Sequence, residues 1–354
     1  MVNAQADSRL KRGALVGAIL AAFAALAALS IWTLQPETSA KRGFAYDMES
    51  LRKIDPALIK FQEERRIETG FAKVAGLALV GRSSGSPGGP EGRPTQSGGV
   101  LLVAGDNSVR AFGSDGKLAR EIKLSGPACA VAVAQDGKVY AGLRDHVEVY
   151  DGQGVLLGKW ESFGKEARIT ALTVAAEDVF IADFGPRVVW RCDLSGKVRN
   201  KIGVRDEARN VPGLIAPSPY LDLAFGADGL LYVNNPGRFC IEAYTPAGDL
   251  EHSWGKPAMG VDGFCGCCNP VSFALRPGGG FATSEKGVAR VKMLDADGNL
   301  ESVVAAPASF GEEAFGIGVA LDGEGRVYVL DTGTRAVRVF NKKKELSDQD
   351  AAGK

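Results

Sequence analysis

The sequence predicts an all-β fold, a six-bladed β-propeller, preceded by one N-terminal transmembrane helix. Three observations lead to it: a four-strand pattern that recurs about every 40 to 50 residues, glycines at its turns, and one long uncharged apolar run. The 354 residues are 45% apolar and 24% charged, as in an ordinary globular protein. The formal net charge is zero, which gives no electrostatic reason to expect a nucleic acid as partner.

The N-terminal region is predicted to anchor the chain in a membrane. Residues 13–34 carry no charge, and about 22 residues of helix span about 33 Å, close to the thickness of a bilayer core. Residues 1–12 are basic, so we expect them in the cytoplasm and the rest of the chain on the extracytoplasmic, periplasmic side. The rival interpretation is a cleaved signal peptide, because an Ala-Leu-Ala within the run resembles a cleavage site. We favour the uncleaved anchor because the apolar run continues past that point.

Residues 57–345 are predicted to form the propeller, between a linker at 35–56 and a polar tail at 346–354. Six stretches share one pattern, among them "GVLLVAGDNSVRAFGSDGKL" and "GRVYVLDTGTRAVRVF". Each holds an apolar strand, a short polar turn and a second strand, and most follow another alternating run. Glycines supply the positive φ that the hairpin turns need. Six four-stranded units at this period are typical of a propeller.

The sixth unit lacks an outer strand of its own. After "AVRVFNKKK" the chain is too polar for a buried strand, whereas the segment 57–71, "ALIKFQEERRIETGF", has no partner. We therefore expect part of this N-terminal segment to complete the last blade. That pairing closes the ring and leaves no sheet edge exposed.

The repeats resemble the NHL repeat. The stretches that carry the resemblance are "GRVYVLDTGTRAVRVF" and "RFCIEAYTPAGDLEHSWG", and the similarity covers the region beyond residue 70. The segment "GFCGCCNP", with the strands after it, also looks like a membrane-anchored bacterial subgroup of NHL-repeat proteins. The resemblance implies a six-bladed propeller but no single activity, since the family includes lyases, lactonase-like hydrolases and binding modules. The lyases use several metal-binding histidines, whereas this chain has two histidines in all.

Three of the six cysteines crowd into "GFCGCCNP", residues 263–270, which leads from the fourth predicted blade to the inner strand of the fifth. In an exported domain we favour a disulfide between Cys240 and one of Cys265, Cys267 and Cys268. The first alternative is a metal site of these four thiolates, holding zinc or an iron–sulfur centre. The second is a labile redox pair. No C-x-x-C-H motif for covalent haem attachment is present.

In a propeller, the loops between blades and between the second and third strands of each blade converge on one face, where ligands commonly bind. The candidates that we place on this face are Cys129, His146, Arg238, Asn269, Arg290 and Arg335. The three arginines, with Arg187, either pair with neighbouring carboxylates or form a basic rim for an acidic partner. A set of carboxylate and amide side chains could instead surround a divalent ion, although such residues more often form turns. These are Asp222, Asn234, Asn235, Asn269 and Asp331.

The sequence thus predicts a membrane-anchored, extracytoplasmic propeller that acts as a protein-binding or assembly module. The competing hypothesis is an enzyme, metal-dependent or redox-active, that uses the face carrying the cysteine-rich loop. We expect two partners, the membrane through the N-terminal helix and a protein on the propeller face, and no nucleic acid.

Overall fold

The computed structural model describes residues 48–80, 100–266, 268–311 and 314–344. The predicted cytoplasmic tail (1–12), transmembrane segment (13–34) and C-terminal tail (346–354) lie outside the described residues. Within the described part, no helix is both long enough and apolar enough to cross a membrane. The helical elements there are α2 (Met48–Arg52) and the 3₁₀ turns Pro56–Leu58, Pro236–Arg238 and Pro307–Ser309.

The described strands form six four-stranded sheets, which confirms the predicted six-bladed propeller. The first blade holds β2 (Val74–Val80), β3 (Val100–Gly105), β4 (Ser108–Phe112) and β5 (Leu118–Lys123). The second holds β6 (Ala130–Val133), β7 (Val139–Gly142), β8 (Val147–Tyr150) and β9 (Leu156–Lys159). The third holds β10 (Ile169–Val174), β11 (Asp178–Asp183), β12 (Val188–Asp193) and β13 (Val198–Ile202).

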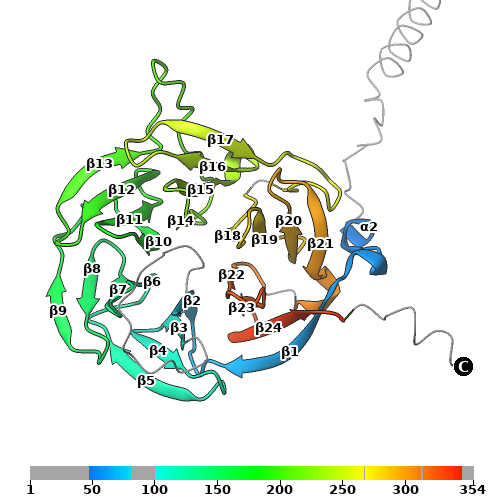
Figure 1. Ribbon diagram of the computed structural model, residues 1–354, viewed down its shortest axis with the longest axis horizontal. Helices are drawn as coiled ribbons and strands as arrows, with labels where there is room; N and C mark the ends of the chain where they lie inside the picture. The colour runs from blue at the N-terminus through cyan, green and yellow to red at the C-terminus, as the bar shows by residue number, and fades with distance from the viewer. Residues whose placement is uncertain (1–47, 81–99, 267, 312–313, 345–354) are drawn as a thin grey trace, which may run out of the picture. The chain divides into compact units, whose positions relative to one another are not determined.

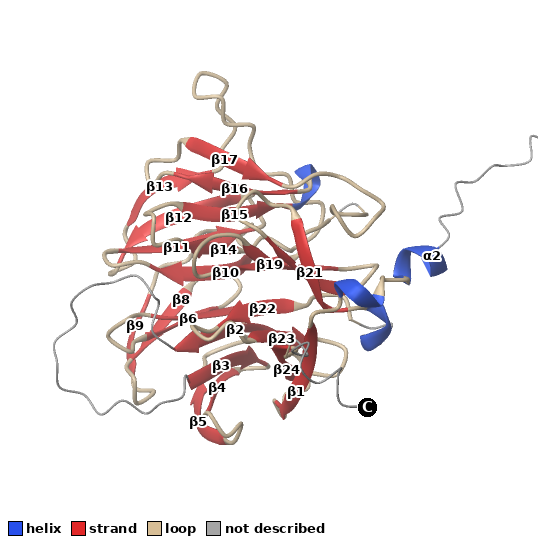
Figure 2. Ribbon diagram, turned by 45° about the vertical axis from the view of Figure 1, so that its right-hand side comes forward, coloured by secondary structure: helices blue, strands red, loops and turns tan. Residues whose placement is uncertain are grey.

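The second half of the ring repeats this order. The fourth blade holds β14 (Leu223–Phe225), β15 (Leu231–Asn235), β16 (Cys240–Tyr244) and β17 (Leu250–Trp254). The fifth holds β18 (Ser272–Leu275), β19 (Phe281–Glu285), β20 (Arg290–Leu294) and β21 (Leu300–Ala305). The sixth holds β22 (Gly318–Leu321), β23 (Val327–Asp331), β24 (Ala336–Lys342) and β1 (Phe61–Glu68). Figure 1 shows the first strand of each blade near the centre and the last at the perimeter, and Figure 2 shows how completely strands dominate.

The burial of each strand follows its position in the blade. All residues of β11 are buried, because the second strand of a blade is covered by the neighbouring blades on both faces. The outermost strand β13 is mostly exposed and carries basic and polar side chains. This difference explains why the second strands are nearly continuous apolar runs in the sequence, whereas the fourth strands are not.

Glycines in the outer hairpins allow adjacent blades to pack closely. Gly196, with a φ of +93°, lies against Trp160 of the preceding blade, and a Cβ there would be 2.5 Å from the indole. Gly298, with a φ of +80°, lies in the same way against Trp254. Both positions need glycine, for the backbone conformation and for the room that the tryptophan takes.

The ring closes between the N-terminal and C-terminal strands, where the sequence predicts it. Strand β1 is antiparallel to β24 with a register from Phe61 opposite Lys342 to Glu68 opposite Ala336. Figure 1 shows these two strands side by side. The main chain of Lys60 also donates to the carbonyl of Val303 in β21, which ties the closing strand to the fifth blade.

Candidate binding face

Two kinds of connection lie on the same side of the ring and define what we call the loop face. The first kind runs from the outer strand of one blade to the inner strand of the next: residues 69–73, 124–129, 160–168, 203–222, 255–271 and 306–317. The second joins the second and third strands of a blade: residues 106–107, 143–146, 184–187, 236–239, 286–289 and 332–335. The hairpins between third and fourth strands lie on the opposite side, the hairpin face.

The three longest connections on the loop face each present an exposed apolar side chain. Ile215 is 47% exposed, Met259 is 45% exposed and Phe315 is 58% exposed. A contiguous group of exposed apolar side chains marks a protein-binding surface, whereas a single one is common on any protein. The hairpin face also exposes apolar side chains, for example Leu156 at 53%, so exposure alone does not identify the site.

Hydrogen bonds from a buried amide hold the loop that carries Ile215. The Asn235 side chain accepts from the main-chain N–H of Ile215 at 2.8 Å and donates to the carbonyl of Gly213 at 3.1 Å. Its amide also donates to the Glu242 carboxylate at 3.0 Å. Tyr244 donates to the same carboxylate at 2.6 Å, and burial together with Glu242 raises the pKa of Tyr244 far above its ordinary value.

A buried ion cluster, Glu285, Arg290 and Lys292, holds the loop that carries Met259. Glu285 Oε1 lies 2.7 Å from Arg290 Nε and 2.8 Å from Lys292 Nζ, and all three side chains are at most 1% exposed. Burial lowers the pKa of Lys292, although Glu285 opposes this effect. Two cations share one carboxylate, so the cluster has surplus donors that must bond elsewhere.

The surplus donors of this cluster bond to main-chain carbonyls of the cysteine-rich loop. Lys292 Nζ donates to the carbonyls of Gly263 at 2.7 Å and Val261 at 3.1 Å, and Arg290 Nη2 donates to that of Gly260 at 3.0 Å. The Cys265 N–H in turn donates to Glu285 at 3.3 Å. The loop is therefore fixed by charge-assisted bonds to the strands below it.

The sequence left two roles open for Arg290, a pair with a neighbouring carboxylate or a place on a basic rim, and the structure shows the pair. Arg290 is 1% exposed, inside the blade, and bonds to Glu285. The physical reason is the register, which puts Glu285 directly opposite Arg290. A signal was available, because Arg290 and Lys292 alternate along a strand whose counterparts in other blades are mainly apolar.

The amide of Asn269 is a loop cap in this structure. Its side chain donates to the carbonyls of Cys265 at 2.5 Å and Lys286 at 3.1 Å, and accepts from the Lys286 N–H at 2.9 Å. These bonds join the cysteine-rich loop to the turn of the fifth blade. Asn269 does lie on the loop face, as predicted, with its side chain turned inward and buried.

The other carboxylates and amides considered for a divalent ion are also occupied by loop contacts. Asn234 donates to the carbonyls of Tyr220 and Pro270, both at 2.8 Å. Asp331 accepts from the main chain of the next turn at Gly333. In the part of the chain that the structure describes, no group of three or more His, Cys, Asp or Glu side chains is arranged to hold a metal ion. The donor set therefore favours a structural role.

The predicted disulfide at Cys240 is wrong in this structure. Cys129, Cys192, Cys240 and Cys265 are thiols, and the thiol of Cys240 points at Glu242, 3.8 Å away, rather than at another sulfur. Burial and Glu242 raise the pKa of Cys240 to about 11, which disfavours the thiolate that disulfide exchange requires. Cys267 lies outside the described residues, so the four-thiolate metal site stays a prediction.

His146 lies on the loop face, where the sequence places it, between two carboxylates. Its Nδ1 is 2.8 Å from Asp145, and its Nε2 is 3.7 Å from Glu148. Ser162 also donates to Asp145, at 2.6 Å, and these bonds from Ser162 and His146 hold the pKa of Asp145 below its ordinary value. Asp145 thus joins the turn 143–146 to the connection 160–168, and His146 bonds to Asp145. Cys129 adjoins the same blade, and both are three blades from the cysteine-rich loop.

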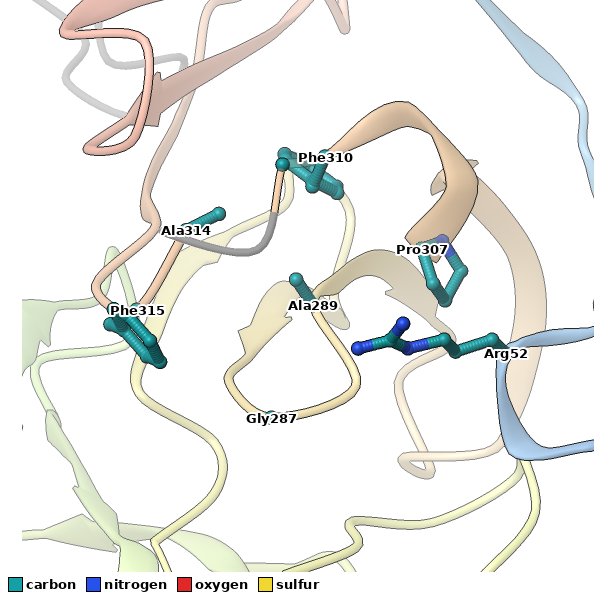
Figure 3. A pocket seen from close by; sticks show the side chains of 8 residues that line it. Arg52, Gly287, Ala289, Pro307, Phe310, Ala314 and Phe315 are labelled. Atoms are coloured by element: carbon teal, nitrogen blue, oxygen red, sulfur yellow. The ribbon is translucent and has the colours of Figure 1, made fainter. Parts of the chain in front are cut away.

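A small cavity opens beside Phe315, between the fifth and sixth blades and α2 (Figure 3). Its lining includes Arg52, Gly287, Ala289, Pro307, Phe310 and Phe315. Its volume, about 60 Å³, is far below the 300–1,000 Å³ usual for small-molecule sites. It could take one protruding side chain of a partner.

No model of a known protein family matches the sequence, and no curated protein matches it. Solved structures share the fold. Streptogramin B lyase is similar with a TM-score of 0.55 and 11% identity, over 82% of this chain and 100% of that one. An inactive virginiamycin B lyase variant from Staphylococcus aureus, solved with quinupristin, is similar with a TM-score of 0.55 and 12% identity, over 80% of this chain and 100% of that one. A protein of unknown function from Bacteroides thetaiotaomicron is similar with a TM-score of 0.54 and 16% identity, over 79% of this chain and 72% of that one. Such low identities show the propeller fold alone.

Proposed function

We propose that this chain is a membrane-anchored, extracytoplasmic module of the NHL-repeat type that binds another protein through its loop face. The observation that carries the proposal is the combination of exposure and rigidity on that face. Ile215, Met259 and Phe315 are exposed to solvent. Buried side chains bond to the connections that carry them: Asn235 to that of Ile215, Lys292 to that of Met259, and Arg338 to that of Phe315. Preorganised loops lose little conformational entropy on binding, so apolar anchors on them contribute efficiently to affinity.

The anchored, extracytoplasmic setting is proposed on the sequence. The uncharged run at 13–34 and the basic residues before it support an uncleaved signal anchor. The resemblance of the repeats and of the "GFCGCCNP" loop to membrane-anchored NHL-repeat proteins supports the same setting. An anchored propeller can present one face to a membrane-bound partner at high effective concentration.

Site-specific photo-crosslinking tests the binding proposal. A photoreactive amino acid would replace Met259 or Phe315 on the loop face, or Leu156 on the hairpin face as the matched exposed control. The full-length protein would be irradiated in its native membranes. We expect adducts of one defined mass from Met259 and Phe315 and none from Leu156. Equal adducts from both faces, or adducts from Leu156 alone, would contradict the proposal.

Protein sequencing and protease protection test the anchor. The intact N-terminus should be found in the membrane fraction, and protease added from outside should digest the propeller. A soluble mature protein that begins near Ala28 would show a cleaved signal peptide instead.

A further inference from the structure

The turns between the second and third strands carry one cation each in four consecutive blades. Blades three to six contribute Arg187, Arg238, Lys286 and Arg335. No acidic residue lies in the described turns that hold these cations, which are 184–187, 236–239, 286–289 and 332–335. We call this set the cationic crescent. The equivalent turn of the first blade carries Asp106 and no cation, and that of the second blade carries Asp145 next to Arg144, so neither adds net positive charge. The loop face therefore has an asymmetric charge, although the chain as a whole is neutral.

Arg187 and Arg335 are exposed and carry no ion pair within the described residues. Both have a left-handed backbone, with φ of 56° and 58°. Such a conformation suits glycine or asparagine, and an arginine there costs conformational energy. Within the described residues, neither guanidinium makes a hydrogen bond, an ion pair or a cation–π contact that would offset this cost, so both are available to a ligand.

The other two members of the crescent also remain available to a ligand. Lys286 donates to the Ser218 hydroxyl at 3.1 Å and lies 4.8 Å from the centre of the Tyr220 ring. The side chain of Arg238 is 45% exposed and lies 3.2 Å from Glu242. Of the four positive charges in the crescent, one is paired with a carboxylate among the described residues: Arg238 pairs with Glu242.

The carboxylates beneath these turns are buried and already bonded. Asp183 accepts from the main chain of Arg168 and Gly185 and from the Trp190 indole. Glu285 is shared by two buried cations, and Asp331 accepts from its own turn. These groups do not pair with the crescent, so its field extends into solvent.

We propose that the cationic crescent recognises an acidic segment of the partner polypeptide that binds the loop face. This inference rests on the proposed function and names the chemistry of the partner. Ile215, Tyr220 and Phe315 belong to the connections beside the crescent, and side chains of a peptide could contact them while its carboxylates meet the arginines. A peptide offers both kinds of group.

The surroundings of the crescent favour a polypeptide over a phosphate backbone or an anionic bilayer. Glu207 and Asp262 lie in the connections on either side of Arg238, with side chains 82% and 57% exposed, and they pair with Arg205 at 2.7 Å and Lys256 at 2.9 Å. Carboxylates and cations therefore alternate around the crescent, and a uniformly anionic surface would meet both. A polypeptide can place its acidic residues only where the cations are.

Fluorescence anisotropy with defined probes tests the inference. The probes are a labelled 15-residue peptide of Glu, Leu and Tyr, the same peptide with Gln at every Glu, a single-stranded RNA 15-mer, and vesicles of phosphatidylglycerol. The full-length protein would be held in nanodiscs of neutral lipid. We expect the Glu peptide to bind at least about tenfold more tightly than the Gln peptide, with the difference shrinking at high salt.

The variant Arg187→Glu/Arg335→Glu should weaken binding of the Glu peptide about tenfold or more, and Arg187→Gln/Arg335→Gln should weaken it less. Lys117→Glu/Lys197→Glu is the matched control, because it reverses two exposed cations on the hairpin face. Equal binding of the two peptides, or equal loss in the control, would overturn the inference. Selective binding of RNA or vesicles that depends on the crescent would also overturn it.

Crosslinking separates this inference from the proposed function. If loop-face adducts at Phe315 persist undiminished in Arg187→Glu/Arg335→Glu, the face binds a protein and the crescent does not recognise it. If no adduct forms even in the unmodified protein, the proposed function itself fails.

Discussion

Glu63 and Arg338, which are 275 residues apart in the chain, close the ring through two hydrogen bonds. Arg338 donates to Glu63 Oε2 from Nη2 at 2.6 Å and from Nε at 2.9 Å. Arg338 also donates to the carbonyl of Ser309 at 2.8 Å and is 4% exposed. The first strand, the last strand and the connection between the fifth and sixth blades therefore meet at one buried guanidinium.

Replacing Glu63 should destabilise the propeller markedly. Glu63→Gln leaves the buried Arg338 with a weaker partner, and we expect a loss of about 2 kcal/mol in the free energy of unfolding. Glu64→Gln is the matched control, since Glu64 is exposed and accepts a bond from Asn341 alone among the described residues; it should change stability by less than about 0.5 kcal/mol. Urea denaturation measures both. Equal losses of stability in the two variants would show that the ion pair of Glu63 and Arg338 does not stabilise the closed ring.

The contribution of Glu63 should depend on pH in a defined direction. Burial raises the pKa of Glu63, but the bonds and charges of Arg338 and Arg66 outweigh this, so the pKa lies below its ordinary value of 4.5. A depressed carboxyl pKa stabilises the fold above the ordinary value, and the effect is lost as pH falls below it. The stability difference between wild type and Glu63→Gln should therefore shrink below about pH 4. A difference that grows on acidification would contradict this.

Two truncations separate the closing strand from the segment before it. Deleting residues 57–70 removes β1 and exposes the edges of β24 and of the fifth blade, so we expect a large loss of thermal stability and aggregation. Deleting residues 1–45 should leave the melting temperature nearly unchanged. Similar melting temperatures for the two truncations would show that β1 does not close the ring.

The closure of the ring by the N-terminal strand could be predicted because it depends on the sequence pattern of the strands and turns. The alternation of apolar residues, the turn glycines and the missing outer strand after Phe340 are visible in the sequence, and they led to the correct blades. The burial of Arg290 was not predictable in the same way. It depends on a strand register that places Glu285 opposite Arg290 and on loop carbonyls that accept the surplus donors. The disulfide failed for a similar reason, since the direction of the Cys240 side chain depends on packing.

The ion cluster under the cysteine-rich loop should respond asymmetrically to substitution. Glu285→Gln leaves two buried cations without a carboxylate and should cost about 3–5 kcal/mol. Lys292→Met leaves the balanced pair of Glu285 and Arg290 and should cost about 1 kcal/mol, while amide exchange in residues 256–266 becomes faster. Chemical denaturation and hydrogen exchange measure these effects. A larger loss from Lys292→Met than from Glu285→Gln would contradict the charge balance.

The thiols should react with iodoacetamide at different rates in the native protein, and none of those at Cys192, Cys240 and Cys265 should need a reductant to react. Burial raises the pKa of Cys192 to about 12 and that of Cys240 to about 11, whereas Cys129 is partly exposed. Iodoacetamide at pH 8 should therefore label native Cys129 first. In denaturant, Cys192, Cys240 and Cys265 should all be labelled without reduction, as mass mapping would show. If Cys240 reacted only after reduction, it would be in a disulfide, and the original prediction would be correct.

The most direct test of the central claim is hydrogen exchange of the full-length protein with and without its bound partner, after extraction from native membranes. If the loop face is the binding surface, amide protection on binding should be confined to residues 203–222, 255–266 and 314–317 and to the turns of the third to sixth blades. The hairpins at 113–117, 151–155 and 194–197 should exchange equally in both states. Protection of these hairpins, with no change in the loop-face connections, would contradict the account.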